Sequence, residues 1–230
     1  MKEKCLILHS GGIDSTTALC LAIKEYGKEN VIALAMTYGQ KHDKEVECAK
    51  KIANYYGIEL ITRDISETFN LDKTCTLLKN NSALEHSTYL EQANLDNNTP
   101  IKSYVPFRNG IMLSYSTVIA LSLNCNIIYY GAHSDDSANG IYPDCSKEFE
   151  YHMCEAIRYG TGNQINMKAP FVNMKKSDIV KIGLENNVPY ELTWSCYEGK
   201  EKSCGKCASC LCRLEAFSLN NSKDPIEYED

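Results

Sequence analysis

Over the first 65 residues, short apolar segments alternate with longer segments in which apolar residues recur at helical spacing. Residues 4–8 and 31–37 are short, largely apolar runs of the length of buried strands, and residues 59–65 are predicted as a third strand. Between these runs apolar residues recur at helical spacing, and Gly27 and Gly57 follow as helix stops. Strand, helix, strand, helix and strand in this order predict an α/β fold with a doubly wound parallel sheet.

The second half of the chain continues this pattern. We expect a fourth strand at residues 126–131 and a short fifth strand that ends at Pro170. Helices are predicted at about residues 109–123, 149–159 and 177–186, because apolar positions recur there at helical spacing.

Residues 66–104 interrupt the pattern. Long irregular stretches in compact domains often form lids or binding loops, and a plain surface insertion is the alternative. The turn-forming residues in this region are Asn80, Asn81, Asn94, Asp96, Asn97, Asn98 and Pro100.

Composition and charge narrow the class of protein. Hydrophobic residues make up 43% of the 230 positions, and no apolar run approaches the roughly 20 residues that span a bilayer. The first residues lack the pattern of a signal peptide, so we expect a soluble, cytoplasmic protein with no membrane partner. A net charge of −6, with a basic cluster of only Lys175, Lys176 and Lys181, favours small-molecule substrates over direct nucleic-acid binding.

A glycine-rich loop, Ser10-Gly11-Gly12-Ile13-Asp14-Ser15, lies between the first predicted strand and helix. Backbone N–H groups and the helix dipole favour an anion at such a junction, and the hydroxyls of Ser10, Ser15 and Thr16 add donors. No lysine follows as in a Walker A loop. The loop resembles the PP-loop of the ATP pyrophosphatases, which grip the pyrophosphate of ATP while a nucleophile attacks the α-phosphate. A tight turn with an N-cap is the simpler alternative.

The chain has twelve cysteines, and four of them have the spacing of metal ligands. Cys196, Cys204, Cys207 and Cys210 are separated by seven, two and two residues, which suits tetrahedral Zn²⁺. No histidine follows Cys196, so a closed structural zinc site is favoured over a catalytic one. An iron–sulfur cluster and redox chemistry are the alternatives, and Cys212 is spaced poorly as a further ligand. Seven scattered cysteines are expected to act as small hydrophobic residues: Cys5, Cys20, Cys48, Cys75, Cys125, Cys145 and Cys154.

Three further stretches combine residues in unusual ways. Arg108 and Asn109 open a predicted helix, and residues 142–145 read Tyr-Pro-Asp-Cys. Lys176 begins another helix, where a cation is unfavourable unless an anion is bound. The simpler interpretations are a surface ion pair for Arg108, a solvated lysine for Lys176 and a turn residue for Asp144. His42 and His133 are expected to be polar loop residues, because neither has a second metal ligand at a recognisable spacing.

The order of these motifs resembles the 7-cyano-7-deazaguanine synthases (QueC) of queuosine and archaeosine biosynthesis over nearly the whole chain. The resemblance implies a PP-loop, Rossmann-like domain at residues 1–190, a small helical zinc-binding subdomain at 191–220 and a polar tail at 221–230. The matching motifs are the Ser-Gly-Gly loop, Tyr38-Gly39-Gln40, Pro106-x-Arg108-Asn109, Tyr142-Pro143-Asp144-Cys145, Lys176, Thr193-Trp194-Ser195-Cys196-Tyr197 and the cysteine cluster.

The resemblance also implies an activity and the residues that carry it. Members of the family convert 7-carboxy-7-deazaguanine to the nitrile with ammonia and two ATP, through adenylated intermediates and an amide. ATP, Mg²⁺ and a structural Zn²⁺ are therefore expected, as is a homodimer. Asp14, Arg108 and Lys176 are the implied catalytic residues, with Asp14 helping to hold Mg²⁺. The implied nucleotide contacts are His9, Ser10, Gly11, Gly12, Ile13, Asp14, Ser15, Thr16, Thr17, Ala18, Leu19, Tyr38, Gln40, Arg108, Asn109, Gly131 and Lys176, and the implied acid-binding residues are Asp136, Tyr142 and Asp144.

The chain departs from the family pattern in two places. Ser146 stands where an arginine is common, and residues 132–136 differ from the commonest form of that loop. Both changes fall where the acid substrate is expected. Two other functions therefore stay open: another PP-loop amide ligase or tRNA thiolation enzyme, and activation of a deazapurine acid for attachment to a protein partner. A tRNA enzyme should carry a basic surface, which this acidic chain does not predict.

Overall fold

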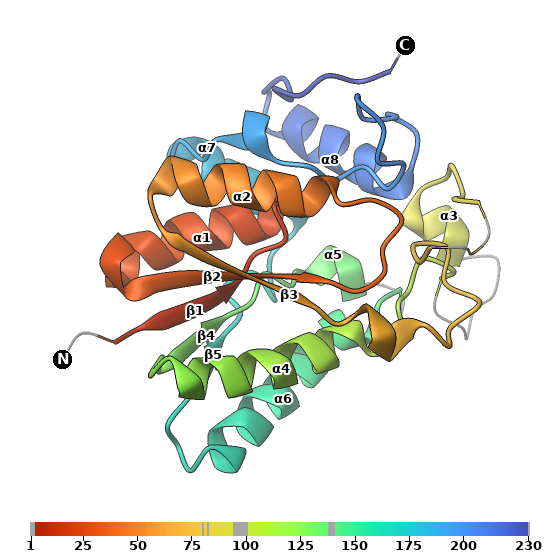
Figure 1. Ribbon diagram of the computed structural model, residues 1–230. Coiled ribbons are helices and arrows are strands. Elements are labelled where there is room, and N and C mark those ends of the chain that lie inside the picture. Colours follow the sequence, from red (N-terminus) through yellow and green to blue (C-terminus); the bar gives the residue numbers. More distant parts are fainter. Residues whose placement is uncertain (1–2, 80, 82, 94–100, 138–140, 230) are drawn as a thin grey trace.

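A five-stranded parallel sheet forms the centre of the molecule (Figure 1). The computed structural model describes residues 3–79, 81, 83–93, 101–137 and 141–229. The sheet has the order β3-β2-β1-β4-β5, and Cys5 of the central strand lies opposite Val31 on one side and Ile127 on the other. The strands are β1 (Cys5–Leu8), β2 (Val31–Thr37), β3 (Glu59–Asp64), β4 (Ile127–Tyr129) and β5 (Asn166–Lys168).

Helices cover both faces of the sheet (Figure 1). One face carries α1 (Ile13–Tyr26), α2 (Lys44–Tyr56) and α7 (Lys176–Glu185), with α8 (Ala208–Leu219) packed on α7. The other carries α4 (Arg108–Ser122) and α6 (Lys147–Gly160). The short helices are α3 (Tyr89–Ala93) and α5 (Ser134–Ser137), and 3-10 turns form at Lys28–Asn30, Ser66–Phe69, Pro143–Cys145 and Tyr190–Leu192.

The two faces of the sheet form two apolar cores. On β1, Cys5 and Ile7 point into the core with α1 and α7, whereas Leu6 points into the core with α4 and α6. Because both faces are buried, β1 and β2 read as continuous apolar runs rather than as alternating ones. The fold class predicted from the sequence is confirmed.

The predicted elements match the structure to within a few residues, with one shorter strand. The strand expected at residues 126–131 comprises only Ile127–Tyr129. The backbone N–H of Tyr130 still donates to the carbonyl of Lys168 at 2.9 Å, and the chain then leaves the sheet toward α5.

The irregular region at residues 66–104 contains α3, and its Leu78 forms an isolated β-bridge with Gln40, which follows β2. Asn81 donates to the carbonyl of Cys75 at 2.8 Å, as a turn residue does. The other residues that predicted turns in this region (Asn80, Asn94, Asp96, Asn97, Asn98 and Pro100) lie outside the described residues.

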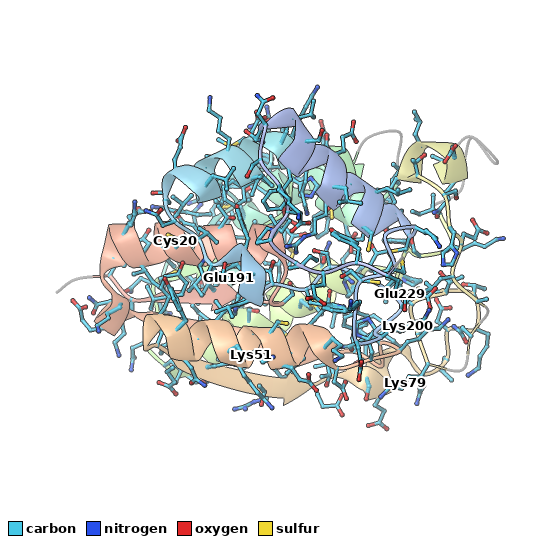
Figure 2. The ribbon with its side chains drawn as sticks, turned by 90° about the horizontal axis from the view of Figure 1, so that it is seen from above. Cys20, Lys51, Lys79, Glu191, Lys200 and Glu229 are labelled. Atoms are coloured by element: carbon cyan, nitrogen blue, oxygen red, sulfur yellow. The ribbon has the colours of Figure 1, made fainter. Side chains whose placement is uncertain are left out.

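The segment predicted as a polar tail packs back on the cysteine-rich region. Asp224 is buried and accepts hydrogen bonds from the guanidinium of Arg213, which is itself fully buried. Lys200 Nζ lies 3.1 Å from Glu229 Oε2, so the segment is also held at its end (Figure 2). The four clustered cysteines belong to the same apolar core as α1. The division into domains at residues 190 and 220 stays a prediction.

In the part of the chain that the structure describes, every helix is too short or too polar to cross a membrane.

Candidate active site and metal centre

The glycine-rich loop follows β1 and leads into the amino terminus of α1. Gly11 has a φ of +89°, and a Cβ there would lie 2.3 Å from the carbonyl oxygen of Glu45, so only glycine fits. Gly12 caps α1 without a side-chain hydrogen bond. The first backbone N–H groups of α1 therefore stay available for an anion, as the sequence predicts.

Four predicted nucleotide contacts lie inside α1 rather than at the loop. The Thr16 hydroxyl donates to the Gly12 carbonyl at 2.6 Å, and the Thr17 hydroxyl donates to the carbonyl of Ile13 at 2.9 Å. Ala18 and Leu19 are fully buried. These four side chains face the core because they lie one to two turns into the helix, so the structure does not bring them to the site.

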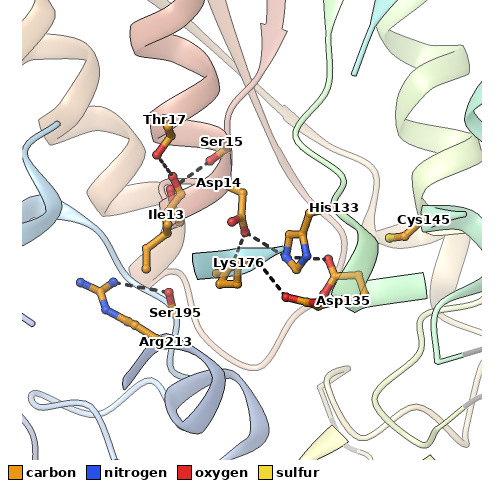
Figure 3. Close-up of polar contacts among 12 residues, drawn as sticks. Ile13, Asp14, Ser15, Thr17, His133, Asp135, Cys145, Lys176, Ser195 and Arg213 are labelled. Atoms are coloured by element: carbon orange, nitrogen blue, oxygen red, sulfur yellow. Dashed lines mark hydrogen bonds and ion pairs between the residues drawn. The ribbon is translucent and has the colours of Figure 1, made fainter. Parts of the chain in front are cut away.

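Asp14 lies in the first turn of α1 and pairs with Lys176, the first residue of α7 (Figure 3). Asp14 Oδ2 takes part in this ion pair and lies 3.7 Å from Nε2 of His133. Burial would raise the pKa of Asp14, but the charges of Lys176 and His133 outweigh it and hold the pKa below its ordinary value. Asp14 Oδ1 is buried and has no hydrogen-bond partner among the described residues.

Lys176 is not a solvated surface lysine. Its side chain is only 13% exposed, and its backbone N–H donates to Oδ2 of Asp135 at 2.7 Å (Figure 3). Burial lowers the pKa of Lys176, yet the Asp14 carboxylate more than offsets this and the net pKa is raised. Lys176 therefore stays cationic beside the phosphate loop.

His133 lies in the loop between β4 and α5, as predicted, but its burial and its contacts were not foreseen. It is almost fully buried, and its Nε2 lies 3.4 Å from Asp136 Oδ2 as well as near Asp14. It follows the carboxyl end of β4, where the side chains of a parallel sheet converge. That position was the sequence signal for its place beside Asp14.

Arg108 begins α4 and faces Tyr38 rather than a surface acid. Its guanidinium carbon lies 5.0 Å from the centre of the Tyr38 ring, and Nη1 donates to the Tyr38 hydroxyl at 3.2 Å. Arg108 Nε is buried and has no partner within the described part of the chain. One edge of the guanidinium is therefore left for an anion.

Asp144 joins the Tyr-Pro-Asp-Cys turn to α4. Its Oδ2 accepts a hydrogen bond from the backbone N–H of Asn109 at 2.8 Å. The Asn109 side chain donates in return to the carbonyl of Asp144 and to Sγ of Cys145, at 3.2 and 3.1 Å. Burial raises the pKa of Asp144. Asp144 is thus a turn residue that also fixes the first turn of α4, and Cys145 is buried, as expected.

Two adjoining cavities open at the carboxyl ends of the strands. Ser10, Asp14, Arg108 and Asn109 line both of them. The first is otherwise lined largely by apolar strand ends, and the second by hydroxyls and charged groups. Of the predicted residues, His9, Ser15, Tyr38, Gln40, Gly131 and Asp136 line the first cavity, and Gly12, Ile13, Tyr38, Asp136, Tyr142, Asp144 and Lys176 line the second.

Glu45, on α2, lines both cavities and was not predicted. Burial raises its pKa from 4.5 to about 7, although Arg108 partly offsets the effect. Nothing in its local sequence distinguishes it from other surface glutamates. Gln40, by contrast, uses Oε1 to accept the Tyr38 N–H at 2.8 Å and so fixes the loop after β2.

The irregular region also contributes to the second cavity. Tyr89 of α3 and Tyr104 line it, so this part of the region lies at the candidate site. Ser146 uses Oγ to accept the N–H of Phe149 at 3.1 Å. The departure from the family pattern at this position thus serves as the N-cap of α6.

Four cysteine sulfurs form a metal site near the carboxyl end of the chain. The Sγ atoms of Cys196, Cys204, Cys207 and Cys210 lie within 4.8 Å of one another, and all four residues are buried. Backbone N–H groups of Cys204 and Cys207 donate to Sγ of Cys196 and Cys204 at 3.3 Å, which favours the thiolate form. Four cysteine sulfurs, with no histidine or carboxylate in the cluster among the described residues, fit a closed structural site. Cys212 lies outside this cluster, as expected.

Comparisons with known proteins agree with this architecture. The model of the family described as queuosine biosynthesis protein QueC matches residues 4–221. The chain is 38% identical to the 7-cyano-7-deazaguanine synthase of Marinomonas sp. (strain MWYL1), with 100% of both chains covered. It is 41% identical to that of Caldicellulosiruptor bescii, with 98% and 97% covered, and 41% identical to that of Picrophilus torridus, with 99% and 92% covered.

A solved structure shows the same fold. NMN synthetase from Francisella tularensis superposes with a TM-score of 0.52 at 17% identity, over 96% of this chain and 79% of that one. This likeness supports the α/β fold, and the family match at residues 4–221 extends over the site and the cysteine cluster. The chain therefore belongs to the QueC family of queuosine biosynthesis proteins.

Proposed function

We propose that this chain converts 7-carboxy-7-deazaguanine and ammonia to 7-cyano-7-deazaguanine at the expense of ATP. The observation that carries the proposal is the position of the phosphate loop, Asp14 and Arg108 on the boundary of two cavities. The reaction must bring a substrate carboxylate to the α-phosphate of ATP. Two anions repel strongly in a site with little water, so fixed cations are needed at this boundary.

The first cavity suits the nucleoside part of ATP. Leu34, Ala35 and Met36 offer an apolar wall to a flat base, while the amino terminus of α1 offers N–H groups to the phosphates. Lys176 adds a positive charge beside the loop. ATP bound in this way would present its α-phosphate toward Arg108 and the second cavity.

The second cavity suits the deazaguanine acid. The hydroxyls of Tyr142 and Ser103 lie 2.9 Å apart in its wall, and Asp136 and Asp144 add acceptors for the N–H groups of a purine-like ring. A site built from hydrogen-bonding groups rejects molecules that leave those groups unpaired. We therefore assign acid recognition to Asp136, Tyr142 and Asp144.

The chemistry then runs in two rounds. An oxygen of the substrate carboxylate attacks the α-phosphate, and pyrophosphate leaves. Ammonia attacks the acyl carbon, AMP leaves, and loss of a proton gives the amide. A second ATP adenylates the amide oxygen, and departure of AMP with the remaining N–H protons gives the nitrile. Arg108 and Lys176 would neutralise charge that develops on the phosphates.

The side chains of this chain offer ligands for two metal ions, Mg²⁺ and Zn²⁺. Asp14 would hold Mg²⁺ through the unpartnered Oδ1, and bound Mg²⁺ would reduce the phosphate charge. The four cysteines would hold Zn²⁺ as a structural ion.

We also propose a homodimer that forms through the outward face of α4. Tyr115, Val118 and Leu121 are exposed on this helix, and residues 109–126 contain no charged side chain. A chain of net charge −6 meets a second copy with least repulsion at an uncharged face. Figure 1 shows α4 on the side of the sheet opposite α1 and α2.

The activity is tested with purified protein, ATP, Mg²⁺, ammonium and 7-carboxy-7-deazaguanine. Mass spectrometry should detect the amide first and the nitrile later, with AMP and pyrophosphate as co-products. Formation of ADP and phosphate would refute the adenylation chemistry. Adenylate that yields amide only after another protein is added would favour the conjugation function, and absence of ATP turnover would refute the substrate.

A further inference from the structure

Trp194 lies between the cysteine cluster and the phosphate loop. It is the only tryptophan of the chain, and it is 8% exposed. Together with Ser10 and Gly12 it lines the second cavity. Neither the reaction chemistry nor the metal site has so far given this residue a role.

The backbone of Trp194 holds the phosphate loop. Its N–H donates to the carbonyl of Gly11 at 3.0 Å. Gly11 already touches the backbone of α2 on its other side, where a Cβ would lie 2.7 Å from the N of Ala49. The loop is therefore fixed from two directions, and one of them is the segment that leads to the cysteines.

The side chain of Trp194 is tied to the metal site. Its indole Nε1 donates to the carbonyl of Cys196 at 2.7 Å. Cys196 supplies one of the four clustered sulfurs. A metal ion that fixes this cysteine fixes the acceptor of the indole N–H, and through Trp194 it fixes the carbonyl of Gly11.

The residues on either side of Trp194 are held equally firmly. Arg213 Nη1 donates to the hydroxyl of Thr193 at 2.8 Å and to that of Ser195 at 3.4 Å (Figure 3). The Arg213 guanidinium is also bound by the buried carboxylate of Asp224. Residues 193–196 therefore form a stiff connection rather than a flexible loop, which is what transmission of a shift between two sites requires.

We propose that Trp194 is a positioning residue that couples metal binding at the four cysteines to nucleotide binding at the phosphate loop. The inference rests on the proposed function, since it assumes that ATP binds at this loop. Coupling between two binding sites is reciprocal, so the metal must tighten nucleotide binding by the same factor by which nucleotide tightens metal binding. A factor of roughly 5 to 150 is typical of such coupling.

The test measures the zinc affinity of the protein by equilibrium competition with a chromogenic chelator, with and without Mg²⁺ and saturating ATP. We expect ATP to tighten zinc binding by about 5- to 150-fold. Pyrophosphate alone should also tighten it, because the proposed connection ends at the phosphate loop. Calorimetry verifies saturation, and the fluorescence of the single tryptophan should change when either ATP binds or zinc leaves.

Trp194→Phe keeps the backbone bond to Gly11 but removes the indole donor to Cys196. We expect this variant to bind zinc and ATP while ATP no longer tightens zinc binding. Tyr129→Phe is the matched control: it removes one buried hydroxyl, bonded to Glu25 at 2.8 Å, and should keep the full gain in zinc affinity.

Two results would overturn the coupling: equal zinc affinity with and without bound ATP, or the full gain in zinc affinity in Trp194→Phe. The wild-type measurement decides even if that variant does not fold. Failure of ATP to bind in calorimetry would instead count against the proposed function.

Discussion

The carboxylate of Asp14 and the ammonium of Lys176 meet where two helices begin, α1 and α7. A cation at a helix amino terminus is unfavourable by itself, because the helix dipole is positive there. Lys176 is stabilised by Asp14, and Asp135 accepts its backbone N–H. The pair thus keeps a buried cation next to the loop that is built to bind phosphate.

Removal of this cation should disable the first chemical step. We expect Lys176→Met to lower the rate of pyrophosphate release by about a hundred- to a thousandfold, because it removes a charge that stabilises the departing phosphates. Lys181→Met on the exposed side of the same helix should leave the rate unchanged. Coupled pyrophosphate detection measures both, and equal rates would contradict the role of Lys176.

Arg108 should not tolerate replacement by lysine. Its guanidinium stacks on Tyr38, and its free edge can offer a planar fork that an ammonium cannot reproduce. We expect Arg108→Lys to slow amide formation at least tenfold while circular dichroism and thermal stability stay close to those of the wild type. Unchanged kinetics would show that only the charge matters.

The four cysteines should bind one zinc ion per chain. We expect Cys204→Ser to lower both the zinc content and the melting temperature, since metal binding at such sites is coupled to folding. Cys212→Ser, a serine replacement outside the cluster, should retain zinc. Elemental analysis provides the measurement, and iron with labile sulfide in its place would identify an iron–sulfur protein.

Glu45 should make stability depend on pH. Its pKa rises from 4.5 to about 7 on folding, so between these values the folded chain holds a proton that the unfolded chain has released. The contribution of Glu45 to stability therefore falls as pH rises through this window. Glu45→Gln should flatten the fall in urea unfolding curves recorded from pH 4.5 to 7. Glu47→Gln, an exposed neighbour on α2, should not, and an unchanged slope in Glu45→Gln would contradict the buried titration.

The α4 face gives a prediction about assembly. Val118→Lys places a charge on the uncharged face and should convert a dimer to a monomer in sedimentation velocity experiments. Leu219→Lys is a matched control, because Leu219 is equally exposed, 65% for each residue, but lies on α8. A monomeric wild type, or a dimer that only Leu219→Lys disrupts, would refute this interface.

The local pattern of the sequence was sufficient for the fold. Strand and helix positions depend on the spacing of apolar residues within a few turns, so β2 and the end of α2 at Gly57 were predicted to the residue. The metal site was also predictable, because its ligands lie close together in sequence. The contacts of Arg108 with Tyr38 were not, since they depend on how distant segments pack.

The site residues that were not predicted from the sequence owe their positions to tertiary packing. His133 and Asp14 are far apart in the sequence and meet only because β4 lies beside β1. The raised pKa of Glu45 results from burial against the phosphate loop. Thr17 shows the same dependence on packing: it belongs to the motif by position, and its hydroxyl bonds inside the core to Tyr190 at 2.8 Å.

The buried pair of Arg213 and Asp224 imposes an order on biosynthesis. Arg213 leaves the ribosome before its carboxylate partner has been translated, and a guanidinium without a counter-charge is costly to bury. The contacts of Arg213 with Thr193 and Ser195 are therefore fully stabilised only after Asp224 has emerged. A nascent chain interrupted between Arg213 and Asp224 would retain all four metal ligands and still lack the carboxylate that neutralises Arg213.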